Sequence, residues 1–371
     1  MLMELSEMRQ VRPISLSAVL MTMAASSSYA HHSVAPNFDL DREIVLADAV
    51  VTEFRFVNPH VYLSLEVPDE RGAVNWRCEM AAASRLKRRG WTAETLVAGQ
   101  IVSIDGSPGR REDNACRVDT ITFADGSTFS RHEGRASAAE VSNALVSEEA
   151  AESRPAYLLN GQPNLGGPWV STQASLDMPE IEPTAAGARA GAGLVRHFDS
   201  PTLSCQPMNI IHDWFFQRES NEIFQADDEI TLQYGYLDLA RTVHLDQSEH
   251  PEQLTPSVTG HSIGWWEGDT LVVDTIGFEP GVLFHSGESG FSMHSDHWRV
   301  VERFEVGTDR RSLIRKYTFG DPLFMQGAYM GQDLHSLTTE PYVPYGCEEL
   351  SGENNQRPVD GPAQSPDDND N

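Results

Sequence analysis

Residues 260–304 constrain the fold most, because they read as a β-hairpin, a long loop and a third strand. Residues 262–266 and 270–275 are short runs of β-branched and aromatic residues, and Glu267, Gly268 and Asp269 between them favour a tight turn. Titratable side chains interrupt the hydrophobic alternation of these strands. A buried strand accepts such groups only where they have a partner, so this stretch predicts a core wall that carries a candidate site.

The second half of the chain contains eight such strand-like runs, separated by short turns such as that at Asp227 and Asp228. The runs are residues 214–217, 222–226, 231–236, 241–245, 262–266, 270–275, 297–305 and 312–318. Strands of this number and spacing predict an up-and-down β-barrel or sandwich of lipocalin-like form over residues 157–349.

The first half predicts a smaller β domain over residues 31–130. Its strand-like runs are residues 45–56, 61–67, 74–80, 101–106 and 117–123. One short helical stretch, residues 81–89, ends at Gly90. Five or six strands with one helix favour a small closed barrel of OB-like topology. The predicted fold class is therefore all-β, with an OB-like barrel followed by a larger lipocalin-like barrel or sandwich.

The two ends and the middle of the chain differ from these domains in composition. Residues 1–30 have two arginines, an apolar run at 14–25 and a small-x-small cleavage site ending at Ala30, as in a signal peptide. The remaining chain has no apolar run long enough to span a bilayer, so we expect a periplasmic or secreted protein without stable membrane insertion. Residues 131–156 are predicted to be a linker, and the acidic residues 350–371 a disordered tail.

Four cysteines in an exported chain predict two disulfides. Three pairings are possible. The pairs Cys78–Cys116 and Cys205–Cys347 are preferred because each stays within one predicted domain.

The formal net charge of −28 limits the classes of partner. No basic cluster is present that could neutralise a phosphate backbone or an anionic membrane surface. Nucleic acid is therefore excluded as an expected partner, and the acidity itself is typical of a highly soluble protein.

The small domain resembles an uncharacterised family of exported bacterial proteins. The resemblance rests on His-His-Ser at 31–33, Asn-Pro-His at 58–60, Arg-Gly-Trp at 89–91 and a Gly-x-x-Val turn at 99–102. It implies export and a conserved architecture, and no established activity.

Residues 157–349 resemble a second uncharacterised exported family. Its motifs are Gly-His-Ser-Ile-Gly at 260–264, the run from Trp266 to Thr275, His-Ser-Asp at 294–296 and Val-Glu-Arg-Phe at 301–304. This resemblance also implies architecture and export, without a known chemistry.

Side-chain alternation predicts an acid–base group within this second domain. If the Asp274 face and the Glu302 face both point into the barrel, two carboxylates share its cavity. His294 or His261 would carry protons at the mouth, and Asp296 would orient His294. Burial raises the pKa of a carboxyl group, and histidine titrates near neutral pH, so such a group could move a proton on a bound molecule.

A purely structural interpretation of the same residues remains open. Asp274 can cap the turn that follows it, and Glu302 can pair with Arg241, Arg299 or Arg303. The many aromatic residues of the domain are suited to a core, and equally to an apolar pocket. The expected ligand-binding residues are Trp298, Trp266, Tyr234 and Tyr236.

A second constellation lies at the predicted mature N-terminus. Cleavage after Ala30 would give His31 a free amine beside its imidazole, and His60 or His32 could add a third nitrogen. Three such nitrogens suit copper. The alternative is that His31 and His32 are a polar chain start and His60 part of a turn.

Several catalytic motifs are absent, namely Gly-x-Ser-x-Gly, His-Glu-x-x-His, the phosphate loop and the dinucleotide fingerprint. The sequence therefore favours a protein that binds a small, largely apolar molecule, with cofactor-free acid–base catalysis of the isomerase or lyase type (isomerisation, cyclisation or hydration). The alternatives are a non-catalytic carrier of an apolar ligand and a copper-binding protein.

Overall fold

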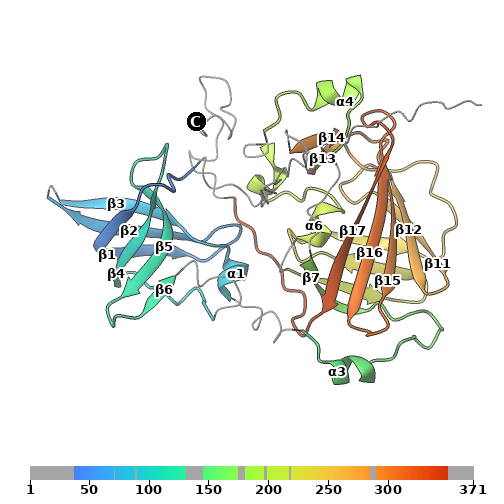
Figure 1. Ribbon diagram of the computed structural model, residues 1–371, viewed down its shortest axis with the longest axis horizontal. Helices are drawn as coiled ribbons and strands as arrows, with labels where there is room; N and C mark the ends of the chain where they lie inside the picture. The colour runs from blue at the N-terminus through green and yellow to red at the C-terminus, as the bar shows by residue number, and fades with distance from the viewer. Residues whose placement is uncertain are drawn as a thin grey trace, which may run out of the picture. The chain divides into compact units, whose positions relative to one another are not determined.

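The computed structural model describes residues 37–70, 72–87, 90–130, 145–173, 180–195, 199–216, 219–284 and 290–349. These residues form two β-barrels with a few short helices (Figure 1). The predicted signal peptide, the N-terminal His31 and His32, the predicted tail and most of the predicted linker lie outside the described residues. Among the described residues, no helix is both long and apolar enough to cross a membrane.

The first barrel is built from five strands that close on one another. They are β1 (Ile44–Arg55), β2 (Tyr62–Asp69), β3 (Gly72–Glu79), β4 (Ile101–Pro108) and β5 (Ala115–Phe123). The sheet order is β3-β2-β1-β4-β5, and a parallel pairing of β3 with β5 closes the ring.

Two further elements complete the first barrel. Helix α1 (Ala83–Lys87) lies between β3 and β4 in the chain, and β6 (Thr128–Ser130) extends the sheet beyond β5. Five strands in this order, with the helix after the third, are the predicted OB-like topology.

A disulfide fastens the closing seam of this barrel. Cys78 on β3 lies directly opposite Cys116 on β5, and their sulfur atoms are 2.01 Å apart. Both residues belong to the buried core, which the alternating inward residues of the strands supply. This pairing was predicted and is confirmed.

The second barrel has nine described strands and is also closed (Figure 1). They are β7 (Gly167–Gln173), β8 (Ser220–Gln225), β9 (Glu229–Gln233), β10 (Ala240–His244), β11 (His261–Glu267), β12 (Thr270–Ile276), β15 (Arg299–Val306), β16 (Ser312–Gly320) and β17 (Ala328–Leu337). Every neighbouring pair is antiparallel except β10 and β11, which run parallel. The predicted lipocalin-like class is confirmed, with the parallel pair as a departure from a simple up-and-down order.

Sequence patterns missed two strands of this barrel, namely β7, which precedes the predicted strands in the chain, and β17, which follows them. β7 begins with Gly167 and Pro168, which are poor strand formers. β17 turns Asp333 and His335 inward, so it lacks the apolar alternation by which strands are identified. Conversely, the predicted strand at 214–217 overlaps a helix, α6 (His212–Phe215).

A small hairpin stands where a long loop was predicted, between β12 and β15. It consists of β13 (Gly281–Phe284) and β14 (Phe291–His294). Gly281 faces His294 across the hairpin, and a Cβ atom at residue 281 would lie 2.6 Å from His294 Nε2. The glycine is therefore required by the close approach of the imidazole.

The remaining elements are short. They are α3 (Glu148–Ser153), α4 (Ala185–Ala190) and the 3-10 helix η1 (Pro201–Ser204). α3 falls within the predicted linker and is capped by Ser147. The second predicted disulfide, Cys205–Cys347, is also present, with an S–S distance of 2.02 Å, and it ties the segment after η1 to the chain beyond β17.

Candidate functional site

The two carboxylates expected to share the barrel interior lie on opposite faces of its wall. In the antiparallel register of β12 and β15, Glu302 lies opposite Val273, not Asp274. Because side chains alternate along a strand, Glu302 and Val273 face inward and Asp274 faces outward. The predicted inward face of β15 is correct, but the structure does not bring the two carboxylates together.

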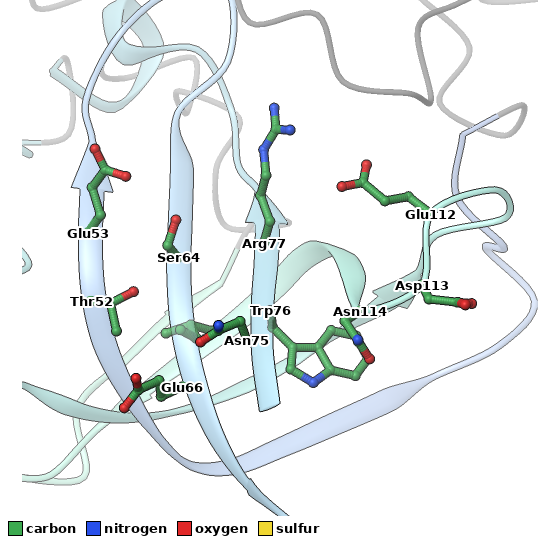
Figure 2. A pocket seen from close by; sticks show the side chains of 11 residues that line it. Thr52, Glu53, Ser64, Glu66, Asn75, Trp76, Arg77, Glu112, Asp113 and Asn114 are labelled. Atoms are coloured by element: carbon green, nitrogen blue, oxygen red, sulfur yellow. The ribbon is translucent and has the colours of Figure 1, made fainter. Parts of the chain in front are cut away.

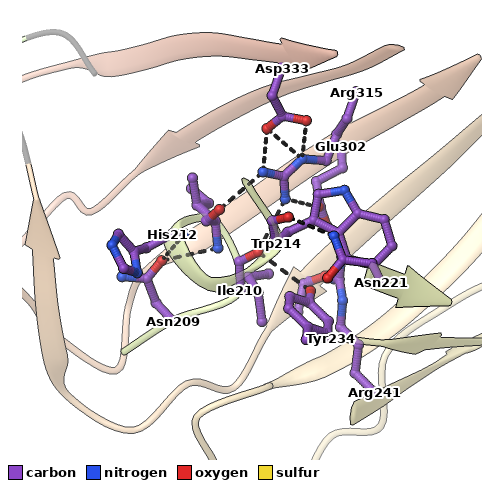
Figure 3. A network of polar contacts seen from close by, with 12 residues as sticks. Asn209, Ile210, His212, Trp214, Asn221, Tyr234, Arg241, Glu302, Arg315 and Asp333 are labelled. Carbon is purple, nitrogen blue, oxygen red and sulfur yellow. Dashed lines mark hydrogen bonds and ion pairs between the residues drawn. The ribbon is translucent and has the colours of Figure 1, made fainter. Parts of the chain in front are cut away.

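Glu302 belongs to a fully buried set of ion pairs inside the barrel (Figure 3). It pairs with Arg241 from β10 and accepts a 3.1 Å hydrogen bond from Arg315 Nη1 on β16. Arg315 Nε also donates to Asp333 Oδ2 at 3.0 Å, and His335 Nδ1 lies 3.3 Å from Asp333 Oδ1. Glu302 is therefore the partner of Arg241, as the structural interpretation of this residue had it.

Charge compensation keeps the guanidinium of Arg315 protonated although it is fully buried. Burial alone would lower the pKa of Arg315, but the carboxylates of Asp333 and Glu302 outweigh burial and raise it. Arg241 is further held by the hydroxyls of Ser262 and Thr275, at 3.3 and 3.2 Å.

Polar side chains of the barrel wall hold helix α6 at both of its ends. Arg315 donates to the carbonyl oxygens of Ile210 and Ile211 at 3.1 and 3.0 Å, just before the helix begins. At the other end, the carbonyl oxygen of Trp214 accepts from Asn221 Nδ2 at 2.7 Å and lies 3.2 Å from His335 Nε2. A helix of four residues leaves most backbone groups unpaired, so the barrel wall supplies their partners.

Helix α6 carries a buried histidine–aspartate pair, His212 and Asp213. His212 Nδ1 lies 2.8 Å from Asp213 Oδ1, and Asp213 Oδ2 accepts the backbone N–H of Met208 at 2.8 Å. Asn209 Oδ1 accepts the backbone N–H of His212 at 2.8 Å and fixes the start of the turn. Asp213 is fully buried, and burial raises its pKa against the opposing effect of His212.

Aromatic side chains surround the imidazole of His212. Its ring centroid lies 4.6 Å from that of Phe284, 5.4 Å from Phe215, 5.9 Å from Phe216 and 6.1 Å from Tyr236. Burial raises the pKa of Tyr236, whose hydroxyl is hydrogen-bonded to Thr202, so this phenol stays protonated. His212 itself is only 7% exposed.

This arrangement fixes the chemistry available to His212. An ionised Asp213 can only accept a hydrogen bond, so Nδ1 carries the imidazole proton and Nε2 keeps its lone pair. Asp213 therefore orients the imidazole of His212 in apolar surroundings.

Asp274 and His261 meet in a second cluster, on the outer face of the barrel. Arg299 Nε donates to Asp274 Oδ1 at 2.8 Å, and His250 Nε2 lies 3.5 Å from Asp274 Oδ2. His250 Nδ1 is 2.9 Å from His261 Nδ1, and the ring of His261 stacks on that of His244. Burial, His250 and His244 lower the pKa of His261.

The parallel pairing of β10 and β11 explains why histidines gather at this place. Parallel neighbours need a crossover connection, and residues 245–260 form it and carry His250 across the outer wall. The seam is tight, because a Cβ atom at Gly264 would lie 2.6 Å from Val243 Cγ1. Sequence analysis included His261 and Asp274 but missed His250, whose loop carries no strand pattern.

His294 and Asp296 do not form the expected pair. His294 is 3% exposed and packs against Trp298 with the ring centroids 4.2 Å apart, and its Nδ1 lies 3.2 Å from the carbonyl oxygen of Ser295. Asp296 instead lies 2.8 Å from Nδ1 of the exposed His297. Burial lowers the pKa of His294 to about 4.

Three of the four predicted ligand-binding aromatic residues belong to the core of the barrel or pack against it, and the fourth contacts His212. Trp298 and Tyr234 are fully buried in the core of the barrel, and Trp266 packs against that core. Tyr236 alone of the four contacts the ring of His212 among the described residues.

The copper hypothesis stays a prediction. His31 lies outside the described residues, and His60 Nδ1 is 3.1 Å from Glu79 Oε1. Within the described ranges, no three His, Cys, Asp or Glu side chains are placed to hold a metal ion.

Comparison with known proteins adds a partial family match. Residues 19–117 match the model of a family of unknown function, DUF6152, which overlaps the small barrel and agrees with its resemblance to an uncharacterised family. No curated protein matches the chain. Among solved structures, one match is a secretory abundant heat soluble (SAHS) protein from Ramazzottius varieornatus, with 12% identity, 47% of this chain and 95% of that chain covered, and a TM-score of 0.20.

His212 and Asp213 are the functional candidates that sequence analysis missed. They interrupt the apolar run at 210–216 as titratable neighbours, which is the same signal that singled out residues 260–304. The strand pattern of residues 214–217 hides this signal, because it separates the aromatic residues from the pair before them.

Replacing Arg315 by methionine should destabilise the protein by about 3–5 kcal/mol, because Asp333 would remain buried without its guanidinium partner and Glu302 would keep only Arg241. The matched control is Arg303→Met on the neighbouring strand, whose partner Glu267 is exposed. The control should cost less than about 1 kcal/mol. Urea unfolding of both variants measures the difference, and equal losses would contradict the buried-pair account.

Stability should fall between pH 7 and pH 4, in part through His294. Its folded pKa of about 4 lies below the ordinary value, so the unfolded chain takes up a proton below about pH 6.5 while the folded chain does not. This difference amounts to about 3 kcal/mol at the acidic end. His294→Gln should flatten the dependence of the unfolding free energy on pH. A curve for the variant that runs parallel to that of the wild-type protein would contradict the assignment.

Proposed function

We propose that the large barrel is a cofactor-free acid–base catalyst for a small, largely apolar molecule. His212 acts as the proton acceptor, and Asp213 holds its imidazole in the required tautomer. The observation that carries the proposal is the 2.8 Å contact between His212 Nδ1 and Asp213 Oδ1, placed among four aromatic rings.

The surroundings of His212 indicate the class of substrate. Phe284, Phe215 and Phe216 offer apolar contacts to a ring-containing body, and the protonated hydroxyl of Tyr236 is a donor for an oxygen atom. A carbonyl compound with an acidic neighbouring C–H bond combines these two features.

The proposed step is a proton transfer at carbon. His212 Nε2 takes the proton, the electrons of the broken C–H bond move toward the carbonyl oxygen, and the resulting imidazolium is stabilised by Asp213. Return of the proton to another carbon gives an isomer, and expulsion of a leaving group gives an elimination product. Both outcomes fit the isomerase or lyase type expected from the sequence.

A simple apolar carrier is less well supported. Its ligand would occupy the barrel interior, but the described interior holds Arg241, Glu302, Arg315, Asp333 and His335. These buried polar and ionic groups are already paired with one another, and an apolar ligand beside them would offer them no hydrogen bonds.

We also propose that the protein acts outside the cytoplasm. Both disulfides are of the kind that persist in oxidising compartments, and each ties together distant parts of the chain. The sequence of residues 1–30 supports the same view.

Proton exchange at carbon tests this function without knowledge of the natural substrate. Small aryl ketones are incubated with the protein in D2O, and deuterium entry beside the carbonyl is followed by NMR. The wild type should accelerate exchange for at least one ketone, and His212→Gln should lose roughly 100-fold or more of that acceleration. Asp213→Asn should lose a similar share while keeping the fold.

The exposed His297→Gln is the matched control and should exchange at the wild-type rate. Exchange that is equally fast with His212→Gln would overturn the proposal, as would a wild type that accelerates no ketone of the series.

A further inference from the structure

The two disulfides of the protein differ in how accessible they are. Cys78 and Cys116 are both 0% exposed and belong to the core of the small barrel. Cys205 and Cys347 are each half-buried, and the residues directly before and after both of them are exposed. A disulfide is opened by a thiolate that reaches one of its sulfur atoms, so the exposed disulfides of a protein are the labile ones.

The disulfide of the small barrel is shielded by the seam on which it lies. Figure 2 shows the outer side of this seam, with Arg77 of β3 and Asn114 of the loop before β5. The backbone N–H of Arg77 donates to the carbonyl oxygen of Asn114 at 2.9 Å, which holds the loop on the strand. Because side chains alternate along β3, Cys78 points to the opposite, buried side. This disulfide therefore serves as an internal control for the other one.

The accessible disulfide joins two segments that both contact Tyr236. The first segment is η1, which ends at Cys205 and whose Thr202 hydroxyl is hydrogen-bonded to the hydroxyl of Tyr236. The second segment is residues 338–349 beyond β17, which we call the C-terminal strap. Its Tyr345 packs edge-on against Tyr236 with the ring centroids 5.1 Å apart. The cysteine of the strap packs against the same apolar cluster.

Tyr236 connects these two segments to the surroundings of His212. Its ring stacks on that of Phe216 with the centroids 3.6 Å apart. Tyr236 and Phe216 are two of the four aromatic rings around the imidazole of His212, at 6.1 and 5.9 Å between centroids. The segments that the disulfide fastens therefore help to place half of the rings around His212.

The end of η1 depends on the disulfide. Cys205 has a φ of 55°, a left-handed conformation that is unfavourable for a residue with a Cβ atom and is usually taken by glycine at the end of a helix. Its backbone N–H donates to the carbonyl oxygen of Thr202 at 3.3 Å. A cross-link restricts the cysteine to this conformation, whereas a free thiol does not. Opening the bond therefore allows the end of η1 to relax.

The strap also depends on the disulfide. Its contacts with the large barrel include two hydrogen bonds to Asp238 Oδ1, from the hydroxyl of Tyr342 at 2.8 Å and from the backbone N–H of Tyr345 at 2.7 Å. Asp238 is exposed, and hydrogen bonds at such a position compete with water. Opening the disulfide leaves non-covalent contacts alone between η1 and the strap, so local opening becomes easier.

We infer that the Cys205–Cys347 disulfide is a reducible latch that controls access to His212. The inference rests on the proposed site at His212 and concerns its regulation. In an oxidising compartment the bond stays closed, and a dithiol opens it. One thiolate of the dithiol attacks a cysteine sulfur and forms a mixed disulfide, which the second thiol then attacks. Two electrons and two protons pass to the protein, which ends with two free thiols, and the dithiol becomes a disulfide.

A titration of the full chain with dithiothreitol under native conditions tests which bond opens. Free thiols are alkylated and identified by mass spectrometry, and circular dichroism shows whether the barrels stay folded. Cys205–Cys347 should be reduced at a roughly tenfold lower concentration than Cys78–Cys116. Reduction of both disulfides at the same concentration would overturn the inference, because the opening would then require unfolding.

Modification of histidines by diethyl pyrocarbonate tests access to His212 without any turnover. The reagent is added after the free thiols have been alkylated, and the modified residues are mapped by mass spectrometry. Reduction should raise the modification rate of His212 roughly fivefold or more, whereas the exposed His297 should react at an unchanged rate. An unchanged rate at His212 in protein with an open Cys205–Cys347 bond would overturn the inference.

The double variant Cys205→Ala/Cys347→Ala should show the faster modification of His212 without reductant, and no further change with it. Should this variant fail to fold, the reduced and alkylated wild-type protein decides alone. Faster modification of His212 without exchange at any ketone would refute the proposed function and leave the latch intact. Ketone exchange with unchanged modification would refute the latch and leave the proposed function intact.

Discussion

The buried guanidinium of Arg315 joins the wall of the large barrel to the segment that fills it. It pairs with Glu302 and Asp333 on neighbouring strands and donates to the carbonyl oxygens of Ile210 and Ile211. A buried charge is tolerated only when its hydrogen bonds are satisfied. The strands that carry Arg315 therefore need the carbonyl groups of the segment inside the barrel, and that segment needs the guanidinium of Arg315. This mutual requirement explains why the interior of the barrel is charged and why helix α6 begins where it does.

The position of His212 and Asp213 follows from this constraint. Both residues come directly after the carbonyl groups that Arg315 holds, and near the end of their helix the single carbonyl group of Trp214 is contacted by Asn221 and His335. The pair is thereby kept away from water and among aromatic rings, where an aspartate can orient an imidazole. The outer cluster of Asp274, His250 and His261 has similar residue types but lies on the wall's outer face, and it follows from the parallel seam of β10 and β11.

Alternation and turn chemistry predicted most of the fold, because they report local geometry. They placed both barrels and the inward face of β15, including Glu302 and Trp298, whereas both disulfides followed from the export signal and the division into domains. They failed where pairing between distant strands decides the outcome: the register that sets Glu302 opposite Val273 cannot be derived from either strand alone. They also failed where inward residues are polar, as in β17 with Asp333 and His335, since the usual apolar signal is missing.

The tautomer of His212 tests the central claim most directly, namely that the barrel holds α6 so that Asp213 fixes this imidazole. The 15N chemical shifts of its ring nitrogens can be measured by NMR at neutral pH in the wild-type protein, with the His212→Gln variant to assign the signals. The account predicts a protonated Nδ1 and an unprotonated Nε2 for His212. A proton on Nε2, or averaged shifts like those of a freely exchanging histidine, would contradict it.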